Sequence, residues 1–318
     1  MRYLCQPVLL SSQAGKSTIK TADLRGAFMK IHSLAILSLL AIFSLAACER
    51  GGDDGSPAAY SSRYQAMPSE PTLLRGATVL TGTGEKLENA DVMMQDGKIV
   101  AVGQSLEAGD MSVVDVSGLW VTPGVIDVHS HLGVYPSPRV SAHSDGNEAT
   151  APNTAEVWAE HSVWPQDPGF VTALAGGVTS LQLLPGSANL FGGRGVTLKN
   201  VPGQSVMDMK FPGAPHGLKM ACGENPKRVY GSRGVPPSTR MGNVAGYRAA
   251  WIAAADYRDK MAAAEKGQGE APLRDLKLET LAGVLDGEIL MHNHCYRADE
   301  MAVMFEIANE FDYKISAF

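Results

Sequence analysis

Two histidines lie one residue apart at the end of an apolar run in the segment VTPGVIDVHSHLG, residues 121–133. Side chains in a strand alternate between its two faces, so His129 and His131 point the same way. Two imidazoles on one face can bind one metal ion. The alternative is a pair of ordinary polar residues at a strand end, and this segment by itself leaves both interpretations open.

A second pair of histidines, His292 and His294, ends another apolar run in EILMHNHCYRADEM. Between the two pairs, Lys219 ends the apolar segment GLKMACG. If these segments are strands of one barrel, their ends converge on one mouth, where neutral imidazoles are good ligands for zinc and similar ions. A surface lysine whose stem snorkels along apolar surface is the alternative for Lys219.

Other polar residues are weaker candidates. His143, His161 and His216 lie in predicted loops, where each is expected to be an ordinary loop histidine, with substrate contact as the alternative. Arg194 in FGGRG can bind a substrate carboxylate through two hydrogen bonds or form a structural ion pair. The segment SDGN, residues 144–147, is typical of a turn.

The elements that position these residues fall into two regions. Between residues 73 and 120, short β-prone runs are separated by glycine and aspartate turns, which predicts a small antiparallel sheet. The dipeptide Asp96-Gly97 between two such runs predicts a two-residue hairpin. We expect this region, residues 71–122, to be part of a β-sandwich.

From Val125 onward, strand-like and helical segments alternate along the chain. This alternation predicts parallel βαβ units, which close a barrel with its active site at the C-terminal strand ends when repeated eight times. The expected strands include residues 125–131, 178–185, 195–200, 217–223 and 288–294, and the expected helices are residues 167–175, 244–265 and 298–311.

The predicted barrel, residues 123–318, is short. A complete barrel of this kind has about 250 residues, whereas about 195 follow Thr122 and supply about six strands. A sheet that stops at its sixth strand has open edges. We therefore expect an incomplete α/β barrel belonging to a longer protein, inactive as it stands.

The sequence of the first 48 residues predicts that the protein is exported. Lys30, the apolar run 34–47 and Cys48 resemble a bacterial lipoprotein signal at residues 29–48, and the run is too short to span a membrane. Residues 1–28 are expected to be a misassigned start, and residues 49–70 a flexible tether. The prediction is a periplasmic protein anchored to the bacterial outer membrane by lipid on Cys48. A plain secretory peptide and an uncleaved anchor are the alternatives.

Charge and cysteine content exclude several classes. The net charge is −6 with scattered lysines and arginines, which indicates neither a nucleic-acid partner nor a polybasic membrane surface. The four cysteines lie far apart without a CxxC pair, so no disulfide framework is expected. The oligomeric state has no signal in the sequence.

The combination of VTPGVIDVHSHLG with GVTSLQLLPGSANLFGGRGVTLK, GLKMACGENPKR and HNHCYRADEM resembles the amidohydrolase superfamily, in particular its imidazolonepropionase-like branch. The resemblance covers residues 73–318. It implies a distorted (β/α)8 barrel, a small β-sandwich formed by segments that flank the barrel, and metal-dependent hydrolysis.

The resemblance also implies a ligand set. His129 and His131 match the ligands on the first strand, and Lys219 matches the lysine that many members carboxylate to bridge two metal ions. His294 matches the fifth-strand ligand when RADE is used as the anchor, with His292 as the alternative. The sixth-strand histidine and the eighth-strand aspartate, the usual general base, have no counterpart in this chain.

The activity implied is hydrolysis of carbon–nitrogen bonds other than peptide bonds, in an amide or cyclic amide of a small molecule. One or two divalent ions, zinc being expected, would activate the attacking hydroxide. A metal-dependent dipeptidase and a catalytically inactive binding lipoprotein are the alternatives.

Overall fold

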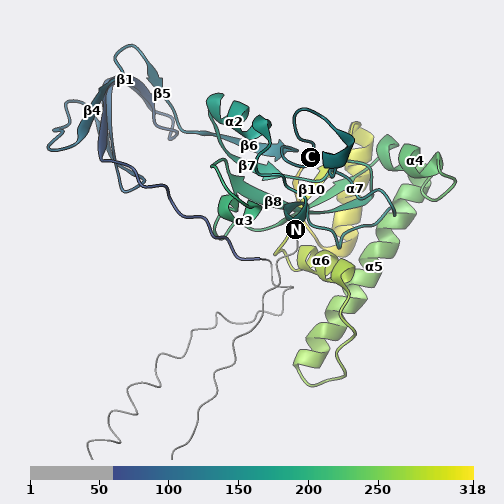
Figure 1. The fold of residues 1–318 in the computed structure, drawn as a ribbon. Coiled ribbons are helices and arrows are strands. Elements are labelled where there is room, and N and C mark those ends of the chain that lie inside the picture. Colours follow the sequence, from purple (N-terminus) through teal and green to yellow (C-terminus); the bar gives the residue numbers. More distant parts are fainter. Residues whose placement is uncertain (1–59) are drawn as a thin grey trace, which may run out of the picture. The chain divides into compact units, whose positions relative to one another are not determined.

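A computed structural model describes residues 60–318 of the chain (Figure 1). The predicted signal, the proposed start at Met29 and the first part of the tether lie outside these residues. No helix within residues 60–318 is long and apolar enough to cross a membrane.

The last part of the predicted tether is bound to the body of the protein. Arg63 donates its backbone N–H to the Met207 carbonyl at 2.8 Å, and Ser62 donates its hydroxyl to the Lys210 carbonyl at 2.6 Å. The Lys210 ammonium in turn donates to the carbonyl of Tyr60 at 2.9 Å. Residues 60–63 are therefore held against residues 207–210 instead of moving freely.

The first sheet contains five strands: β1 (Thr72–Leu80), β2 (Lys86–Gln95), β3 (Lys98–Gly103), β4 (Ser112–Asp115) and β5 (Trp120–Val121). The predicted hairpin is confirmed, since Asp96 and Gly97 join β2 to β3 with φ angles of 52° and 71°, as a type I′ turn requires. The prediction that all strands are antiparallel was wrong. Strands β4 and β5 both run parallel to β1, because the chain crosses back before pairing with it.

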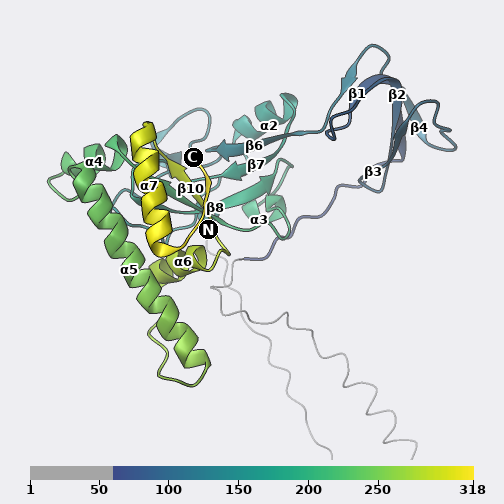
Figure 2. The same ribbon diagram turned by 180° about the vertical axis from the view of Figure 1, so that it is seen from behind.

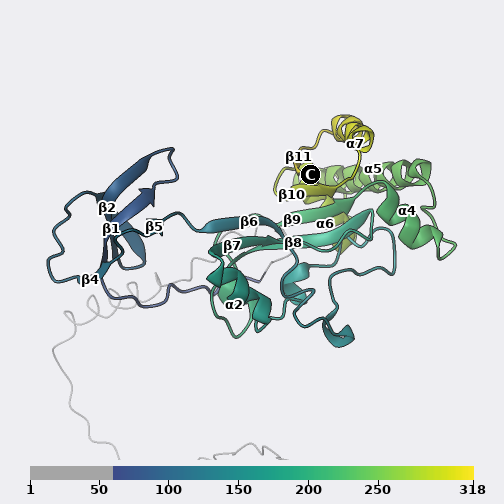
Figure 3. The ribbon, with the colours of Figure 1, turned by 90° about the horizontal axis from the view of Figure 1, so that it is seen from above.

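The second sheet carries the candidate site. It contains six strands in the order β6-β7-β8-β9-β10-β11, so each strand lies beside the one that follows it in the chain (Figure 3). Their bounds are β6 (Val125–Ser130), β7 (Val178–Leu183), β8 (Phe191–Lys199), β9 (Gly217–Ala221), β10 (Leu290–His294) and β11 (Ile315–Ala317).

The prediction of uniformly parallel strands was wrong at β8. This strand runs antiparallel to both β7 and β9, whereas β6 and β7 are parallel and β9, β10 and β11 are parallel. Only residues 184–190 connect β7 to β8, and a parallel crossover needs about a dozen residues or more. The chain therefore reverses direction at this connection.

Helices cover the outer face of the second sheet. They are α2 (Pro168–Ala175), α3 (Val206–Met209), α4 (Glu224–Gly231), α5 (Arg240–Glu265), α6 (Leu276–Leu285) and α7 (Ala298–Phe311), with short 3-10 turns η1 (Ser141–His143) and η2 (Ala159–His161). The three helices expected from the sequence are confirmed as α2, α5 and α7. Helices α5 and α7 lie side by side against this face, in front of the sheet in the view of Figure 2.

The main core lies between β8 to β10 and the helices α5, α6 and α7. Trp251 of α5 is completely buried, and its ring meets Phe191 of β8 at 5.3 Å between centroids. Leu218 and Met220 of β9 belong to the same core. Since alternate residues of a strand face opposite ways, this packing directs Lys219 to the inner face of the sheet.

Candidate functional site

His129 and His131 lie together at the C-terminal end of β6, as predicted. Their ring centroids are 5.1 Å apart and the rings meet edge to face. Beyond them, the chain is held by Asp167, whose carboxylate accepts backbone N–H groups from Gly133 at 2.9 Å and Ser137 at 3.0 Å. The same carboxylate caps α2 through the N–H of Gly169. One acidic residue therefore fixes both the loop after the histidines and the helix start.

The tautomer of His131 is determined by its neighbour. Its Nδ1 lies 2.7 Å from the carbonyl oxygen of Leu184, which can only accept a hydrogen bond. Nδ1 therefore donates, and the Nε2 lone pair remains available for another partner. This arrangement is the usual one for histidines that bind metal ions through Nε2.

Lys219 is buried on the inner face of β9, so the surface-lysine interpretation was wrong. Its side chain is among the largest that the described structure buries almost completely. Its Nζ lies 3.0 Å from His129 Nε2 and donates to the carbonyl of Pro185 at 3.2 Å. Burial lowers the pKa of Lys219 to about 8. The surroundings thus make the neutral amine more accessible than in an exposed lysine, and no carboxylate in residues 60–318 forms a salt bridge with it.

The two histidines of β10 both face the inner side of the second sheet but lie at different positions along the strand. His292 pairs with Lys219 in the ladder between β9 and β10, whereas His294 pairs with Ala221 at the strand end. His294 Nε2 lies 3.3 Å from Asn225 Nδ2, and its ring packs edge to face on Tyr296. His292, in contrast, lines a cavity of about 40 Å³ together with His129 and Lys219.

The electrostatics of the cluster favour uncharged imidazoles. Burial is the main cause that lowers the pKa of His129, to about 4, and the charge of Lys219 is the next. The pKa values of His131, His292 and His294 are also lowered, chiefly by burial. Neutral imidazoles are the form that ligates metal ions.

These residues fit a divalent ion by the chemistry of their donors. Within residues 60–318, no three histidine, cysteine, aspartate or glutamate side chains are close enough together to share one ion. The predicted set therefore depends on Lys219 in addition to the histidines. A buried lysine without a counterion is costly if it is charged. A carboxylated lysine would instead supply the anionic oxygens that divalent ions prefer.

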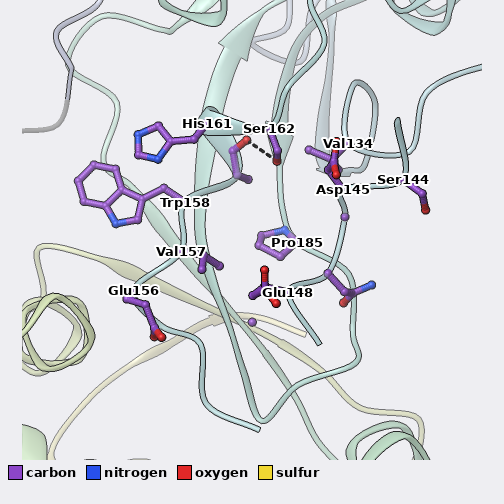
Figure 4. A pocket seen from close by; sticks show the side chains of 14 residues that line it. Val134, Ser144, Asp145, Glu148, Glu156, Val157, Trp158, His161, Ser162 and Pro185 are labelled. Carbon is purple, nitrogen blue, oxygen red and sulfur yellow. Dashed lines mark hydrogen bonds between the residues drawn. The ribbon is translucent and has the colours of Figure 1, made fainter. Parts of the chain in front are cut away.

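A larger pocket, of about 620 Å³, opens on the other side of Pro185 (Figure 4). Its walls include Glu148, Glu156, Trp158 and His161. Pro185 lines this pocket and also accepts the hydrogen bond from Lys219. Pro185 therefore borders both the pocket and the surroundings of the Lys219 head group.

Arg194 has a structural role on the outer face of β8. Its Nε donates to the Thr280 hydroxyl of α6 at 2.8 Å, and its guanidinium lies 4.2 Å from the centre of the Trp158 ring. Burial lowers its pKa to about 10. It forms no salt bridge with the carboxylates of residues 60–318, so of the two alternatives for Arg194 the ion pair is not formed, and a hydrogen bond and a stacking contact take its place.

The loop histidines contact protein groups. His143 stacks on Trp164 at 4.8 Å, and His161 stacks on Trp158 at 5.6 Å. His216 Nδ1 donates to the Gly195 carbonyl at 3.1 Å. Of these, only His161 lines the large pocket.

Sequence reasoning missed a buried ion pair beside His216. Glu160 and Lys210 form a salt bridge of 2.6 Å, with both side chains nearly inaccessible to solvent. The two residues are far apart in the chain, and neither lies in a motif. No local signal in the sequence indicates that they meet.

Sequence reasoning also did not anticipate the link between Cys222 and Cys295. These residues are bonded as a disulfide with Cα atoms 5.2 Å apart. They follow β9 and β10, which are neighbours in the sheet, so the fold brings together cysteines separated by 73 positions. This single cross-link ties together the strand ends that carry Lys219 and His294.

Comparison with known proteins identifies relatives along most of the chain. The amidohydrolase tasK of Hapsidospora irregularis is 34% identical over 295 residues, covering 81% of this chain and 30% of that protein. A dihydroorotase of Pelotomaculum thermopropionicum is 35% identical over 95 residues, which are 27% of this chain and 22% of that enzyme. No family model matches the sequence.

The crystal structure of an amidohydrolase from Thermotoga maritima has the same fold. It superimposes with a TM-score of 0.73 at 40% identity, over 77% of this chain and 63% of that one. The predicted α/β class and partial barrel are confirmed by this agreement and by the open six-stranded sheet. The chain thus spans less than two thirds of the length of these relatives. Because sequence and fold agree with amidohydrolases over most of its length, the chain belongs to the amidohydrolase superfamily.

Proposed function

We propose that this protein is a metal-dependent hydrolase of carbon–nitrogen bonds in small amides or cyclic amides. The observation that carries the proposal is the contact between Lys219 and His129, which places a buried amine of lowered pKa against an imidazole at two strand ends. The relatives named amidohydrolase and dihydroorotase support the same bond type.

The residues of this chain have distinct roles in that proposal. His129, His131 and His294 would hold one or two divalent ions, with Lys219 as a carboxylated bridge. Bound there, the ions would lower the pKa of a water molecule and polarise the scissile carbonyl. The Leu184 carbonyl holds His131 Nδ1, which would leave Nε2 free to ligate an ion. Zinc is our choice because imidazole ligands suit it.

A double substitution tests the metal site. We expect His129→Ala with His131→Ala, made in the protein as encoded by its complete gene, to remove bound metal and amide hydrolysis while the helical circular dichroism remains. Elemental analysis of the purified protein measures the metal. His143→Ala is the matched control, because His143 stacks on Trp164 and contacts none of the site residues. Unchanged metal content in the double variant would contradict the site.

We also propose that the protein is tethered by lipid on Cys48 at the periplasmic face of the bacterial outer membrane. The signal-like segment 29–48 supports this location, and Glu49 is not the aspartate that commonly retains such proteins at the inner membrane. Mass spectrometry of the membrane fraction should find a mature chain beginning at acylated Cys48. A chain that still carries residues 34–47, or an unmodified Cys48, would contradict the proposal.

A further inference from the structure

The segment SDGN, residues 144–147, contacts two loops of the candidate site. Asp145 donates its backbone N–H to the Val134 carbonyl at 3.0 Å, which anchors the segment to the loop after β6. The Gly146 carbonyl accepts the backbone N–H of Gly186 at 2.7 Å, which anchors it to the connection between β7 and β8. Two loops that are far apart in the chain are thus joined by one short segment.

The connection between β7 and β8 supplies backbone partners to two predicted metal ligands. The Leu184 carbonyl accepts the hydrogen bond of His131 Nδ1 at 2.7 Å, and the Pro185 carbonyl accepts that of Lys219 Nζ at 3.2 Å. The start of the connection is fixed to β6, because Leu184 donates its N–H to the Ser130 carbonyl at 3.0 Å. Its later residues depend on contacts outside the sheet.

The side chain of Asn147 provides such a contact and uses both ends of its amide. Oδ1 accepts the backbone N–H of Ala188 at 3.1 Å, and Nδ2 donates to the hydroxyl of Tyr135. A backbone N–H can only donate, so the amide oxygen must face Ala188 and the nitrogen must face Tyr135. The amide therefore bonds to the connection between β7 and β8 with one end and to the loop after β6 with the other.

Two glycines allow these groups to approach so closely. A Cβ atom on Gly146 would clash with the Tyr135 ring, and a Cβ atom on Gly186 would clash with the Asn147 amide. The Tyr135 ring in turn packs edge to face on His131, with 5.8 Å between the ring centroids. Tyr135 is therefore held between Asn147 and a predicted metal ligand.

We propose that Asn147 is a positioning residue that locks the loop after β6 to the connection between β7 and β8. Through Tyr135 and this connection, it holds the groups that orient His131 and Lys219. The lock stands on contacts within residues 60–318, whereas its effect on metal binding rests on the proposed function. Groups that orient metal ligands typically change metal affinity about 10- to 100-fold when they are removed.

Hydrogen exchange of the metal-free protein, encoded by its complete gene, tests the lock without any assay of activity. Asn147→Ala removes both hydrogen bonds, so we expect backbone amides of residues 184–190 to exchange about 10-fold faster. Tyr135→Phe keeps the ring beside His131 but loses one bond, and exchange should rise about 3-fold. Asn309→Ala, at an exposed position of α7, is the matched control. Unchanged exchange in Asn147→Ala would overturn the proposal, as would unchanged exchange in Tyr135→Phe if Asn147→Ala failed to fold.

Zinc affinity, measured by competition with a chelator, tests the positioning role. We expect the Kd for zinc to rise about 10-fold or more in Asn147→Ala, less in Tyr135→Phe, and not in Asn309→Ala. Faster exchange of residues 184–190 with unchanged zinc affinity would overturn the positioning role. A native protein that binds neither zinc nor another divalent ion would contradict the proposed function and the positioning role together, whereas the exchange result by itself decides whether the lock exists.

Discussion

Lys219 combines features that rarely occur together in one lysine. It is 1% exposed, it contacts a neutral imidazole, and its nearest oxygen partner is the uncharged carbonyl of Pro185. An ammonium without a counterion is costly in such a place. Carboxylation needs the neutral amine, which the lowered pKa of Lys219 favours. At the scale of single residues, these observations support a bridging carbamate.

Lys219→Ala should lower amide hydrolysis about 100-fold or more, because the bridging oxygens disappear. Added short carboxylic acids should restore part of the activity, since their oxygens can occupy the same place. Steady-state kinetics with and without propionate measures both effects, and Lys260→Ala, a surface lysine paired with Asp256, is the control. A fully active Lys219→Ala enzyme without added carboxylate would contradict the bridge.

Strand β8 is joined to its surroundings by Arg194 as well as by the apolar packing of Phe191, Val196 and Leu198. Gly193 and Gly195 flank the arginine and offer no side chains, while the guanidinium reaches Thr280 of α6 and the face of Trp158. A buried guanidinium that is stacked and hydrogen-bonded stabilises the attachment of the loop 153–160 and α6 to this strand. At the scale of elements, Arg194 is therefore a structural residue.

Arg194→Met keeps most of the apolar stem but loses the hydrogen bond to Thr280 and the cation–π contact. We expect the free energy of unfolding to fall by about 1–3 kcal/mol, with the metal content of the folded protein unchanged. Urea denaturation followed by tryptophan fluorescence measures the difference. Arg258→Met, at a more exposed pair with Asp259, should change stability by about 0.5 kcal/mol or less. Loss of metal from folded Arg194→Met would indicate a role in the site instead.

For the molecule as a whole, buried histidines contribute to how the free energy of unfolding depends on pH. The pKa of His216 is lowered from 6.5 to about 4, chiefly by burial, so the unfolded chain binds a proton between these values that the folded chain does not. The stability from this group is fully present above pH 6.5 and is lost as the pH falls toward 4. The lowered pKa values of His131 and His292 act in the same direction.

His216→Asn should therefore reduce the acid sensitivity of the metal-free protein. Asparagine keeps a donor for the Gly195 carbonyl but does not titrate. We expect the loss of unfolding free energy between pH 7 and pH 5 to shrink by about 1–2 kcal/mol. Urea titrations at both pH values measure it, with His143→Asn at an exposed site as control. Equal pH dependence in His216→Asn and the native protein would contradict this account.

Local patterns in the sequence predicted much of the site and its supports. Strand alternation placed His129 beside His131 and directed Lys219 away from Leu218 and Met220, and the structure confirms both. The Asp96-Gly97 turn and the helices α2, α5 and α7 also follow from nearest-neighbour chemistry. These features depend on residues close together in the chain, whose periodicity and turn preferences act before any long-range contact forms.

Only the tertiary structure decided which distant residues meet. The reversal of β8 depends on the short connection after β7, and the parallel pairing of β4 with β1 depends on a crossover. The contact of Lys219 with His129, the pairing of Glu160 with Lys210, and the hydrogen bond from Ala188 to Asn147 all join separate elements. Sequence by itself determined the residue types, the local elements and the family resemblance. Long-range contacts require the strand order and direction of the whole sheet, which no local pattern encodes.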